Sequence, residues 1–315
     1  MNRPIRESCP ACGDSSRDLQ ITSLIAPWLK ELAEVPLSNC QYVICQGCKS
    51  GYANVLFLKD EFYKIYSDYR GKEYLQIRHK WEPSYSQILN ESLDRGDLLF
   101  KARRAELERI LDQLNSNFRQ NVRVVVDVGG GHGSFIPDWP SIERRIVIDV
   151  SSSDTKRGIE KYSDWSYFRE PQEIQLVMNC MVLEHLNAPK EFLIRLREDF
   201  LSYCSIPEKT LFYFEVPQGI PLRSKLTSKK WLLSLASKHS FFWSLLDKLV
   251  VRKPESWPLR IAEHIQFFTG EGMCRLLQSS GFEPILVTDF EINQALEGSA
   301  GIRFSSTLAV VAKLK

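Results

Sequence analysis

Residues 122–133, VRVVVDVGGGHG, decide how this chain is expected to fold. The first half is a short, β-branched apolar run, which is typical of a strand buried on both faces. The run ends at Asp127 and continues into glycines at positions 129, 130, 131 and 133. Glycine permits a sharp turn and lets a ligand come close to the backbone. A strand that leads into such a turn and then into a helix is a common nucleotide site, so we expect one here.

The spacing of the glycines departs from the dinucleotide pattern GxGxxG. Gly129 and Gly131 begin that pattern, but the third glycine, Gly133, comes one residue too early. Asp127 precedes the first glycine, and no lysine of the phosphate-binding kind follows the last. These features favour a positively charged ligand over a pyrophosphate, and a glycine-rich turn without a ligand is the alternative.

A second acidic residue ends the next predicted strand, residues 145–149. Asp149 follows Asp127 by 22 residues. An acid at the tip of the second strand can accept hydrogen bonds from both ribose hydroxyls of an adenosine ligand. This spacing strengthens the interpretation of the glycine loop, and the alternative is an aspartate that only ends the strand in a turn with the serines at 151–153.

Composition limits the class of protein. The chain has 315 residues, 43% hydrophobic residues and a net charge of +2, which suits one large domain or a domain with an appendage and gives no strong affinity for polyanions. The first residues lack an apolar signal region, and no window of ~20 residues is uniformly apolar, so we expect neither a secretion signal nor a transmembrane helix. Eight cysteines without a signal indicate reduced thiols, metal binding and a cytoplasmic location.

Two CxxC pairs lie near the N-terminus. Cys9 and Cys12 form the first pair, and Cys45 and Cys48 form the second after 32 intervening residues. Two such knuckles can supply four thiolates in a tetrahedron, the closed type of structural zinc site. A segment this small has little core of its own, which gives a structural metal a purpose. Cys40 is a spare thiol that could replace one ligand, and two unrelated CxxC pairs are the alternative.

Residues 57–85 are dense in tyrosine and tryptophan within a polar segment. We expect a packing strip between two domains, with Tyr66 or Tyr69 as the alternative contribution to a ligand pocket. Apolar residues recur at helical spacing over residues 86–114, which predicts one helix.

Strands and helices alternate after the glycine loop, which predicts a doubly wound α/β sheet. We expect a short helix after Gly133, Asp164 or Ser166 near an adenine, and a helix that Thr269 caps and Gly281 ends. The other predicted strands are 165–168, 173–179 and 210–216, followed by an antiparallel edge of 284–292 and 306–314.

Residues 218–258 are long for a connection between a strand and a helix, so we expect an insertion with its own structure. Its centre is amphipathic, and lysines and arginines recur over residues 225–253. A lid or packing element is the favoured interpretation, and a dimer contact or a peripheral contact with an anionic membrane are the alternatives.

The ordered motifs VVDVGGGHG, RIVIDV, LVMNCMVLEHLNAPKEFL, LFYFEVP and EHIQFFTGEGMCRLLQSSGFE resemble those of class I S-adenosylmethionine (SAM)-dependent methyltransferases. The resemblance extends from residue 122 to the C-terminus and is interrupted by the insertion. With the CxxC pairs in front, the chain further resembles the sugar C-methyltransferase-like group. Those enzymes carry an N-terminal zinc-binding domain, and some of them methylate nucleotide-linked keto-sugars.

The resemblance implies a Rossmann-like methyltransferase sheet with an antiparallel C-terminal edge, preceded by a small zinc-ribbon-like domain. The implied segments are a zinc-binding domain (1–58), an aromatic and helical connector (59–121), the first part of the SAM-binding domain (122–217), a helical insertion or lid (218–260) and the C-terminal part of the SAM-binding domain (261–315).

The resemblance also implies the cofactor site. The loop would lie along the methionine part of SAM, Asp149 would bind the ribose and Asn179 would line the pocket near the sulfonium. The expected cofactor-binding residues are Asp127, Gly129, Gly131, Gly133, Asp149, Asn179 and Tyr69.

A Tyr-x-Glu-His stretch supplies polar catalytic residues in the sugar-modifying enzymes. Glu263 and His264 match it, but Ile261 stands in place of the tyrosine. We expect His264, steered by Glu263, to act as a base, with His185 as the second candidate. Hydrogen-bonded structural histidines are the alternative.

The predicted function is methyl transfer from SAM to a small metabolite, in particular a nucleotide-linked sugar or a related carbonyl or hydroxyl acceptor. A non-catalytic binding or scaffold protein with a degenerate methyltransferase domain is the alternative, because the tyrosine is missing and the insertion is large. Asn179 is followed by Cys-Met-Val and not by Pro-Pro-aromatic, and the charge is near neutral, which weighs against methylation of nucleic acid.

Overall fold

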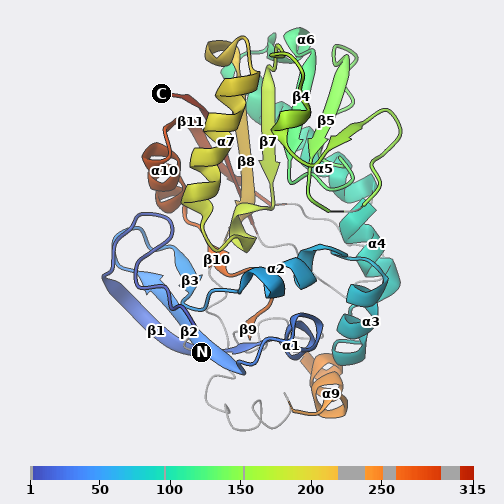
Figure 1. Ribbon diagram of the computed structural model, residues 1–315, viewed down its shortest axis with the longest axis vertical. Coiled ribbons are helices and arrows are strands. Elements are labelled where there is room, and N and C mark those ends of the chain that lie inside the picture. The colour runs from blue at the N-terminus through green and yellow to red at the C-terminus, as the bar shows by residue number, and fades with distance from the viewer. Residues whose placement is uncertain (1–2, 96, 152, 219–237, 251–259, 292–305) are drawn as a thin grey trace.

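The structure of the chain is a computed structural model that describes residues 3–95, 97–151, 153–218, 238–250, 260–291 and 306–315. A seven-stranded sheet occupies one end of the molecule and a five-stranded sheet the other, and α2 (Lys59–Tyr66) runs between them (Figure 1).

The larger sheet has the strand order β11-β12-β8-β7-β4-β5-β6. The five strands from β8 to the edge strand β6 are parallel, and β12 pairs antiparallel with both β8 and β11. This confirms the predicted doubly wound sheet and its antiparallel C-terminal edge. The strands are β4 (Val124–Val128), β5 (Arg144–Ile148), β6 (Glu160–Tyr162), β7 (Leu176–Cys180), β8 (Leu211–Pro217), β11 (Phe282–Phe290) and β12 (Thr307–Leu314).

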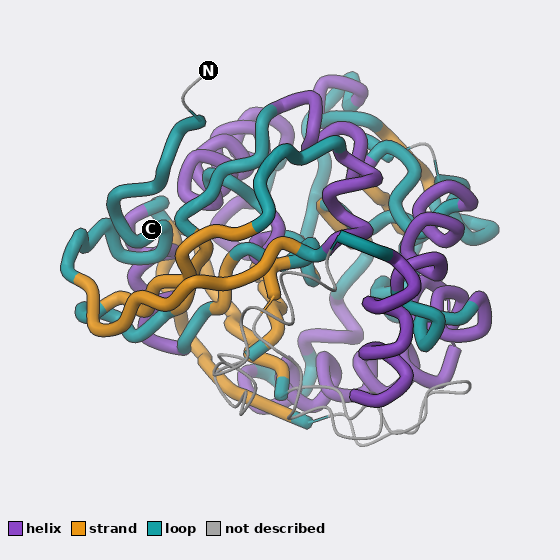
Figure 2. The backbone as a smooth tube through the Cα atoms, turned by 90° about the horizontal axis from the view of Figure 1, so that it is seen from below, coloured by secondary structure: helices purple, strands orange, loops and turns teal. Residues whose placement is uncertain are grey.

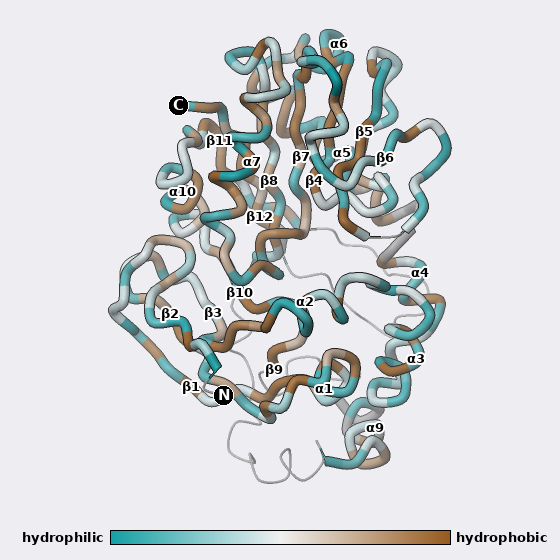
Figure 3. Tube along the Cα trace, viewed as in Figure 1, coloured by the Kyte–Doolittle hydropathy of each residue, from teal (hydrophilic) through white to brown (hydrophobic). Residues whose placement is uncertain are grey.

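Helices cover both faces of this sheet, which is why its central strands are apolar along their whole length. Every residue of β4 is buried. Val126 packs in one apolar cluster with α7 (Pro189–Tyr203) and α10 (Gly270–Ser279), whereas its neighbour Val125 packs in another with α5 (Asp97–Leu114). Successive side chains of a strand point to opposite faces, so both faces of the run are buried and every position except Asp127 is hydrophobic. Figure 3 shows the hydrophobic colour concentrated on β4, β7 and β8.

The smaller sheet has the order β10-β3-β2-β1-β9 and is built from two distant parts of the chain. Its inner strands are β1 (Arg17–Ile25), β2 (Asn39–Cys45) and β3 (Gly51–Ala53), and its edges are β9 (Arg260–Ile261) and β10 (Gln266–Phe267). Seen from below, its strands lie together on one side of the molecule, opposite a group of helices (Figure 2).

The two edge strands revise one predicted boundary. The segment that begins at residue 261 was expected to belong to the SAM-binding domain, but Ile261 pairs with Ile25 of β1 and Gln266 pairs with Tyr52 of β3. Strand edges carry unpaired backbone groups, and residues 260–267 satisfy those of the N-terminal sheet.

Three predicted elements differ from those observed. The expected helix over 86–114 is two helices, α4 (Gln87–Arg95) and α5, on either side of position 96. Residues 134–143 form turns and no helix, and Pro137 and Pro140 lack the N–H that a helix needs. The third parallel strand is β6, whereas residues 165–168 begin with the 3₁₀ turn η1 (Trp165–Tyr167).

The remaining helices are α1 (Pro27–Ala33), α3 (Lys72–Trp81), α6 (Phe118–Asn121) and α9 (Ser240–Val250). Only residues 238–250 of the central insertion lie within the described part, so the proposed lid, dimer contact or membrane contact over 225–253 falls largely outside it. Among the helices that can be described, none combines the length and apolar character that crossing a bilayer requires.

Candidate active site and metal centre

A cavity of about 1070 Å³ opens where the parallel strands end, between the two sheets. The last residues of β4, β5 and β7 (Val128, Ile148 and Cys180) line it. Tyr69 lines it from the aromatic connector and His264 from the connection between β9 and β10. The cavity therefore lies at the carboxyl ends of the strands, the usual ligand position in a doubly wound sheet.

The glycine loop forms one wall. Gly129 and Gly131 have φ angles of +78° and +53°, a region that glycine enters without steric cost. A Cβ atom on Gly129 would lie 2.5 Å from Val182 Cγ2, whereas one on Gly131 would meet no atom within 4 Å. Both residues line the cavity, so a ligand can approach bare backbone there. Gly133 lies behind the wall, where an added Cβ would be 2.6 Å from Ile159 Cδ1.

Asp149 follows β5 and lines the cavity beside this loop. Its Oδ2 accepts a hydrogen bond from the Gly131 amide at 2.9 Å, and its Oδ1 accepts one from the Ser151 amide at 2.7 Å. A carboxylate offers about four lone-pair sites, so it can accept further bonds from hydroxyl groups of a ligand. Asp164, which was expected near an adenine, also lines the cavity.

Asp127 lies beneath the loop, close under Gly130, and does not itself line the cavity. Its side chain is fully buried, and neither carboxylate oxygen has a hydrogen-bond partner among the described residues. Burial, and then the charges of Asp149 and Glu215, raise its pKa to about 8. An unpaired carboxylate this close to a cavity suits a ligand that carries a positive charge.

Asn179 lies in β7 and not in the cavity wall where the sequence placed it. Its Nδ2 donates to the Val128 carbonyl at 2.8 Å, so the amide joins the ends of β7 and β4. Its Oδ1 has no partner within the described chain.

The opposite side of the cavity brings together the predicted catalytic residues. His185 belongs to the 3₁₀ turn η2 (Leu183–His185) after β7, and its ring centroid lies 4.7 Å from that of His264. His185 Nδ1 donates to the Glu263 carbonyl at 3.0 Å, so the Nε2 of a neutral ring carries the lone pair. Burial, followed by the charge of His264, lowers the pKa of His185 to about 3, which keeps this ring neutral.

The Glu263 carboxylate is bound by side chains of the segment before α3 and of α3 itself. It accepts bonds from the Tyr74 hydroxyl at 3.1 Å, the Tyr69 hydroxyl at 3.4 Å and Arg78 Nη1 at 3.2 Å. Burial raises its pKa, but electrostatic interactions with Arg78, His264, His185 and Arg70 together outweigh burial and bring the pKa to about 2. The expectation that this carboxylate steers His264 is therefore corrected: Arg78 holds it, and only the backbone carbonyl of Glu263 positions an imidazole, that of His185.

Several residues of the site carry no recognisable signal in the sequence. Arg103 of α5 lines the cavity and forms a buried ion pair with Glu215 of β8, whose Oε2 also accepts from the Tyr213 hydroxyl at 2.9 Å. Arg78 and Tyr74 lie almost 190 residues before Glu263 in the chain. Such partners lie on elements far apart in the chain and come together only in the folded protein, so local pattern cannot find them.

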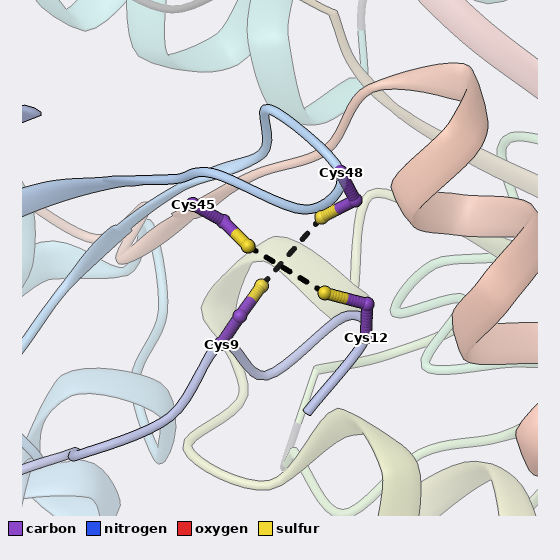
Figure 4. A group of neighbouring side chains, drawn as sticks. All are labelled: Cys9, Cys12, Cys45 and Cys48. Carbon is purple, nitrogen blue, oxygen red and sulfur yellow. Dashed lines mark hydrogen bonds between the residues drawn. The ribbon is translucent and has the colours of Figure 1, made fainter. Parts of the chain in front are cut away.

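The four predicted metal ligands converge on one point. The sulfurs of Cys9, Cys12, Cys45 and Cys48 face one another, with Cys9–Cys48 at 3.7 Å and Cys12–Cys45 at 3.5 Å (Figure 4). Zn–S bonds of about 2.3 Å in a tetrahedron require sulfurs about 3.8 Å apart, so the donor set fits zinc. Cys40 is buried in β2 and does not belong to this group.

Comparison with known families gives one match. A family model described as a methyltransferase domain matches residues 99–287, more than half of the chain. No curated protein matches the sequence.

Among solved structures, the chain is similar to LepI in complex with SAM (13% identity, 65% of this chain and 46% of that one, TM-score 0.35). It is also similar to 1,6-didemethyltoxoflavin-N1-methyltransferase of Burkholderia thailandensis (11% identity, 69% and 78% coverage, TM-score 0.39). A third is magnesium protoporphyrin IX methyltransferase of Synechocystis PCC 6803 (14% identity, 67% and 83% coverage, TM-score 0.35). The chain spans less than half the length of LepI.

Proposed function

Since this chain belongs to the methyltransferase domain family, we propose that it transfers the methyl group of SAM to a small metabolite, in particular a nucleotide-linked sugar. The observation that carries the proposal is the arrangement of the cavity, with the glycine loop and Asp149 on one side and two histidines on the other. SAM supplies a methyl group on a positively charged sulfur. Transfer of that group is an in-line displacement, so the chief task of the protein is to position the two reactants.

The donor side would be held by the glycine loop. Asp149 would accept the ribose hydroxyls, and the backbone at Gly129 and Gly131 would lie along the methionine part. Asp127, buried and without a hydrogen-bond partner in the described part, would ionise when the positively charged ligand binds and would then supply negative charge beneath the loop. Asn179 would hold the end of β7 in place, since its amide bonds to Val128.

The acceptor side suits a ligand that carries a negative charge. Arg70 lines the cavity, forms no ion pair with any described residue, and lies over the Tyr69 ring at 5.0 Å from its centroid. A guanidinium in this position fits a phosphate group, as a nucleotide-linked sugar would offer. The hydroxyls of Tyr69 and Tyr74 reach Glu263 and provide the phenols that Ile261, a buried residue of β9, cannot provide.

Formation of the new bond releases a proton from the acceptor. His264 lines the cavity and has no restraining bond from the Glu263 carboxylate, so it is the proposed proton acceptor, with neutral His185 as the second. Glu263 acts as a positioning residue, because Arg78 keeps its carboxylate ionised and its carbonyl orients His185.

The four cysteines would hold one structural Zn²⁺. Four thiolates complete the tetrahedral coordination of one Zn²⁺ and leave no position open for a substrate, as is typical of a structural site. This metal would stabilise the N-terminal sheet, whose knuckles carry few apolar residues.

Calorimetry with S-adenosylhomocysteine tests the donor site. Asp149→Ala should weaken binding about 10- to 100-fold, because hydrogen bonds to a charged group contribute about 1.5–3 kcal/mol. Asp138→Ala is the matched control, since that carboxylate is 80% exposed and lies outside the cavity lining. Absence of binding by the wild type, or equal binding by Asp149→Ala, would refute the proposed donor site.

Mass spectrometry of a reaction panel tests the acceptor class. The protein and SAM are incubated with nucleotide sugars, and each acceptor is followed for the mass of one added methyl group. Arg70→Gln should raise the KM of a phosphorylated acceptor more than it lowers kcat. If S-adenosylhomocysteine binds but no nucleotide sugar gains a methyl group, the donor proposal stands and the acceptor proposal fails.

A further inference from the structure

A second group of metal-ligating side chains lies beside the cavity, apart from the four cysteines. One ligand atom from each of Glu184, His185 and His264 lies within 4.8 Å of the others. Glu184 and His185 come from η2 of the larger sheet, and His264 comes from the connection between β9 and β10. The Ile265 amide donates to the Glu184 carbonyl at 3.0 Å and fixes the two segments against each other.

Glu184 is a buried carboxylate whose oxygens form no hydrogen bonds with the described residues. Its side chain has no exposed surface. Arg103 contributes a favourable charge but directs its guanidinium to Glu215. Burying an unpaired carboxylate is costly, so such a group either takes up a proton or binds a cation.

The imidazole of His185 directs the lone pair of its Nε2 toward the Glu184 carboxylate. Its Nδ1 proton is engaged by the Glu263 carbonyl, and His185 Nε2 lies 3.8 Å from Glu184 Oε1. That separation is too long for a hydrogen bond. It does suit two ligands of one ion, because metal–nitrogen and metal–oxygen bonds of about 2.0–2.2 Å place neighbouring donors roughly 3–4 Å apart.

We propose that Glu184, His185 and His264 bind one divalent first-row metal ion. Two imidazoles and one carboxylate suit Mn²⁺, Fe²⁺, Co²⁺ or Zn²⁺, and a three-residue set leaves coordination positions open. Both histidines line the cavity, so these positions face the space for the acceptor. A role for the ion in binding an acceptor oxygen rests on the proposed function, whereas ion binding itself does not.

The two proposals for the histidines apply to different states of the protein. Without the ion, His264 is free to take a proton from the acceptor. With the ion bound, both imidazoles use their lone pairs as ligands, and the charge of the ion lowers the pKa of an acceptor hydroxyl in their place.

Electron paramagnetic resonance with Mn²⁺ tests the site on the full chain. Mn²⁺ prefers oxygen and nitrogen donors over thiolates, so the four cysteines do not compete for it. We expect one Mn²⁺ to bind per chain after an EDTA wash. Glu184→Gln and His264→Gln should each weaken its affinity at least about tenfold, the loss that even an indirect ligand partner causes.

Two controls separate this result from a folding defect or a failed donor site. His239→Gln removes an exposed histidine and should leave Mn²⁺ binding unchanged. Calorimetry with S-adenosylhomocysteine reports on each variant independently of the metal and should be unaffected in Glu184→Gln. Failure of the wild type to bind Mn²⁺, or undiminished binding in both ligand variants, overturns the metal site whatever the outcome for S-adenosylhomocysteine.

Discussion

Asp127 is an ionisable residue in the buried strand β4. The same residue ends the apolar run of β4 and stands beneath the glycine loop, fully buried and close to Asp149. Its raised pKa means that the folded protein without a ligand binds a proton that the unfolded chain releases. Folding then becomes less favourable as the pH rises from the unfolded pKa of 3.8 to the folded pKa of about 8.

Replacement of this carboxyl by an amide should remove that dependence. Asp127→Asn cannot ionise, so its free energy of unfolding should exceed that of the wild type increasingly from pH 5 to pH 8, by at most about 1.4 kcal/mol per pH unit. Urea denaturation of both proteins at several pH values measures the difference. A difference that stays constant with pH, or that grows toward low pH, contradicts the assignment.

At the scale of elements, α10 joins the two halves of the molecule. Its N-cap residue Thr269 accepts a bond from the Gly272 amide at 3.0 Å, as the sequence predicted. The same hydroxyl donates to the Cys48 carbonyl at 2.6 Å. The helix start is therefore fixed to the second cysteine knuckle, a contact that no pattern in the sequence announces.

Loss of the Thr269 hydroxyl should destabilise both the start of α10 and its contact with the second cysteine knuckle. Thr269→Ala removes the cap and the bond to the knuckle, and we expect about 1–2 kcal/mol of lost stability from the cap and one further hydrogen bond. Thr269→Ser keeps the hydroxyl and should lose much less. Denaturant unfolding of the two variants measures this, and an equal loss in both would mean that the methyl group matters instead.

At the scale of the whole molecule, the connection between β9 and β10 is where the two sheets meet. The Ile265 amide donates to the carbonyl of Glu184 in η2, the turn that follows β7 of the larger sheet. The Ile265 carbonyl accepts a hydrogen bond from the Ala53 amide of β3 in the smaller sheet. Glu263 and His264 lie on this connection. The smaller sheet therefore helps to place the acceptor side of the cavity, while the donor side is built on β4, β5 and β7 of the larger sheet.

Loss of the proposed structural zinc should affect the acceptor side of the cavity more than the donor side. We expect Cys9→Ser to lose zinc and to speed amide hydrogen exchange over residues 260–268, with little change over residues 124–131. Cys40→Ser should keep its zinc and show wild-type exchange, because Cys40 lies outside the thiolate group. Metal analysis with hydrogen-exchange mass spectrometry tests this, and faster exchange over residues 124–131 as well would mean that the two sides do not behave independently.

Features that depend on local pattern could be predicted from the amino-acid sequence. The valines of β4, the glycines after them, Asp149 at the next strand end and the two CxxC pairs all lie within short stretches. Each of these features follows from backbone conformation, burial of one strand or the geometry of a knuckle. Two predictions from short segments were wrong: the helix expected after Gly133 and the strand expected over residues 165–168.

The contacts between groups far apart in the chain depend on how the elements pack in three dimensions. Glu263 faces Arg78 and Tyr74, and Glu184 and His185 face His264, because β9 and β10 complete a sheet that begins almost 250 residues earlier. The charge state and hydrogen bonds of a buried side chain depend on whichever groups surround it in space. Sequence spacing carries no information about those groups when they lie on elements far apart in the chain.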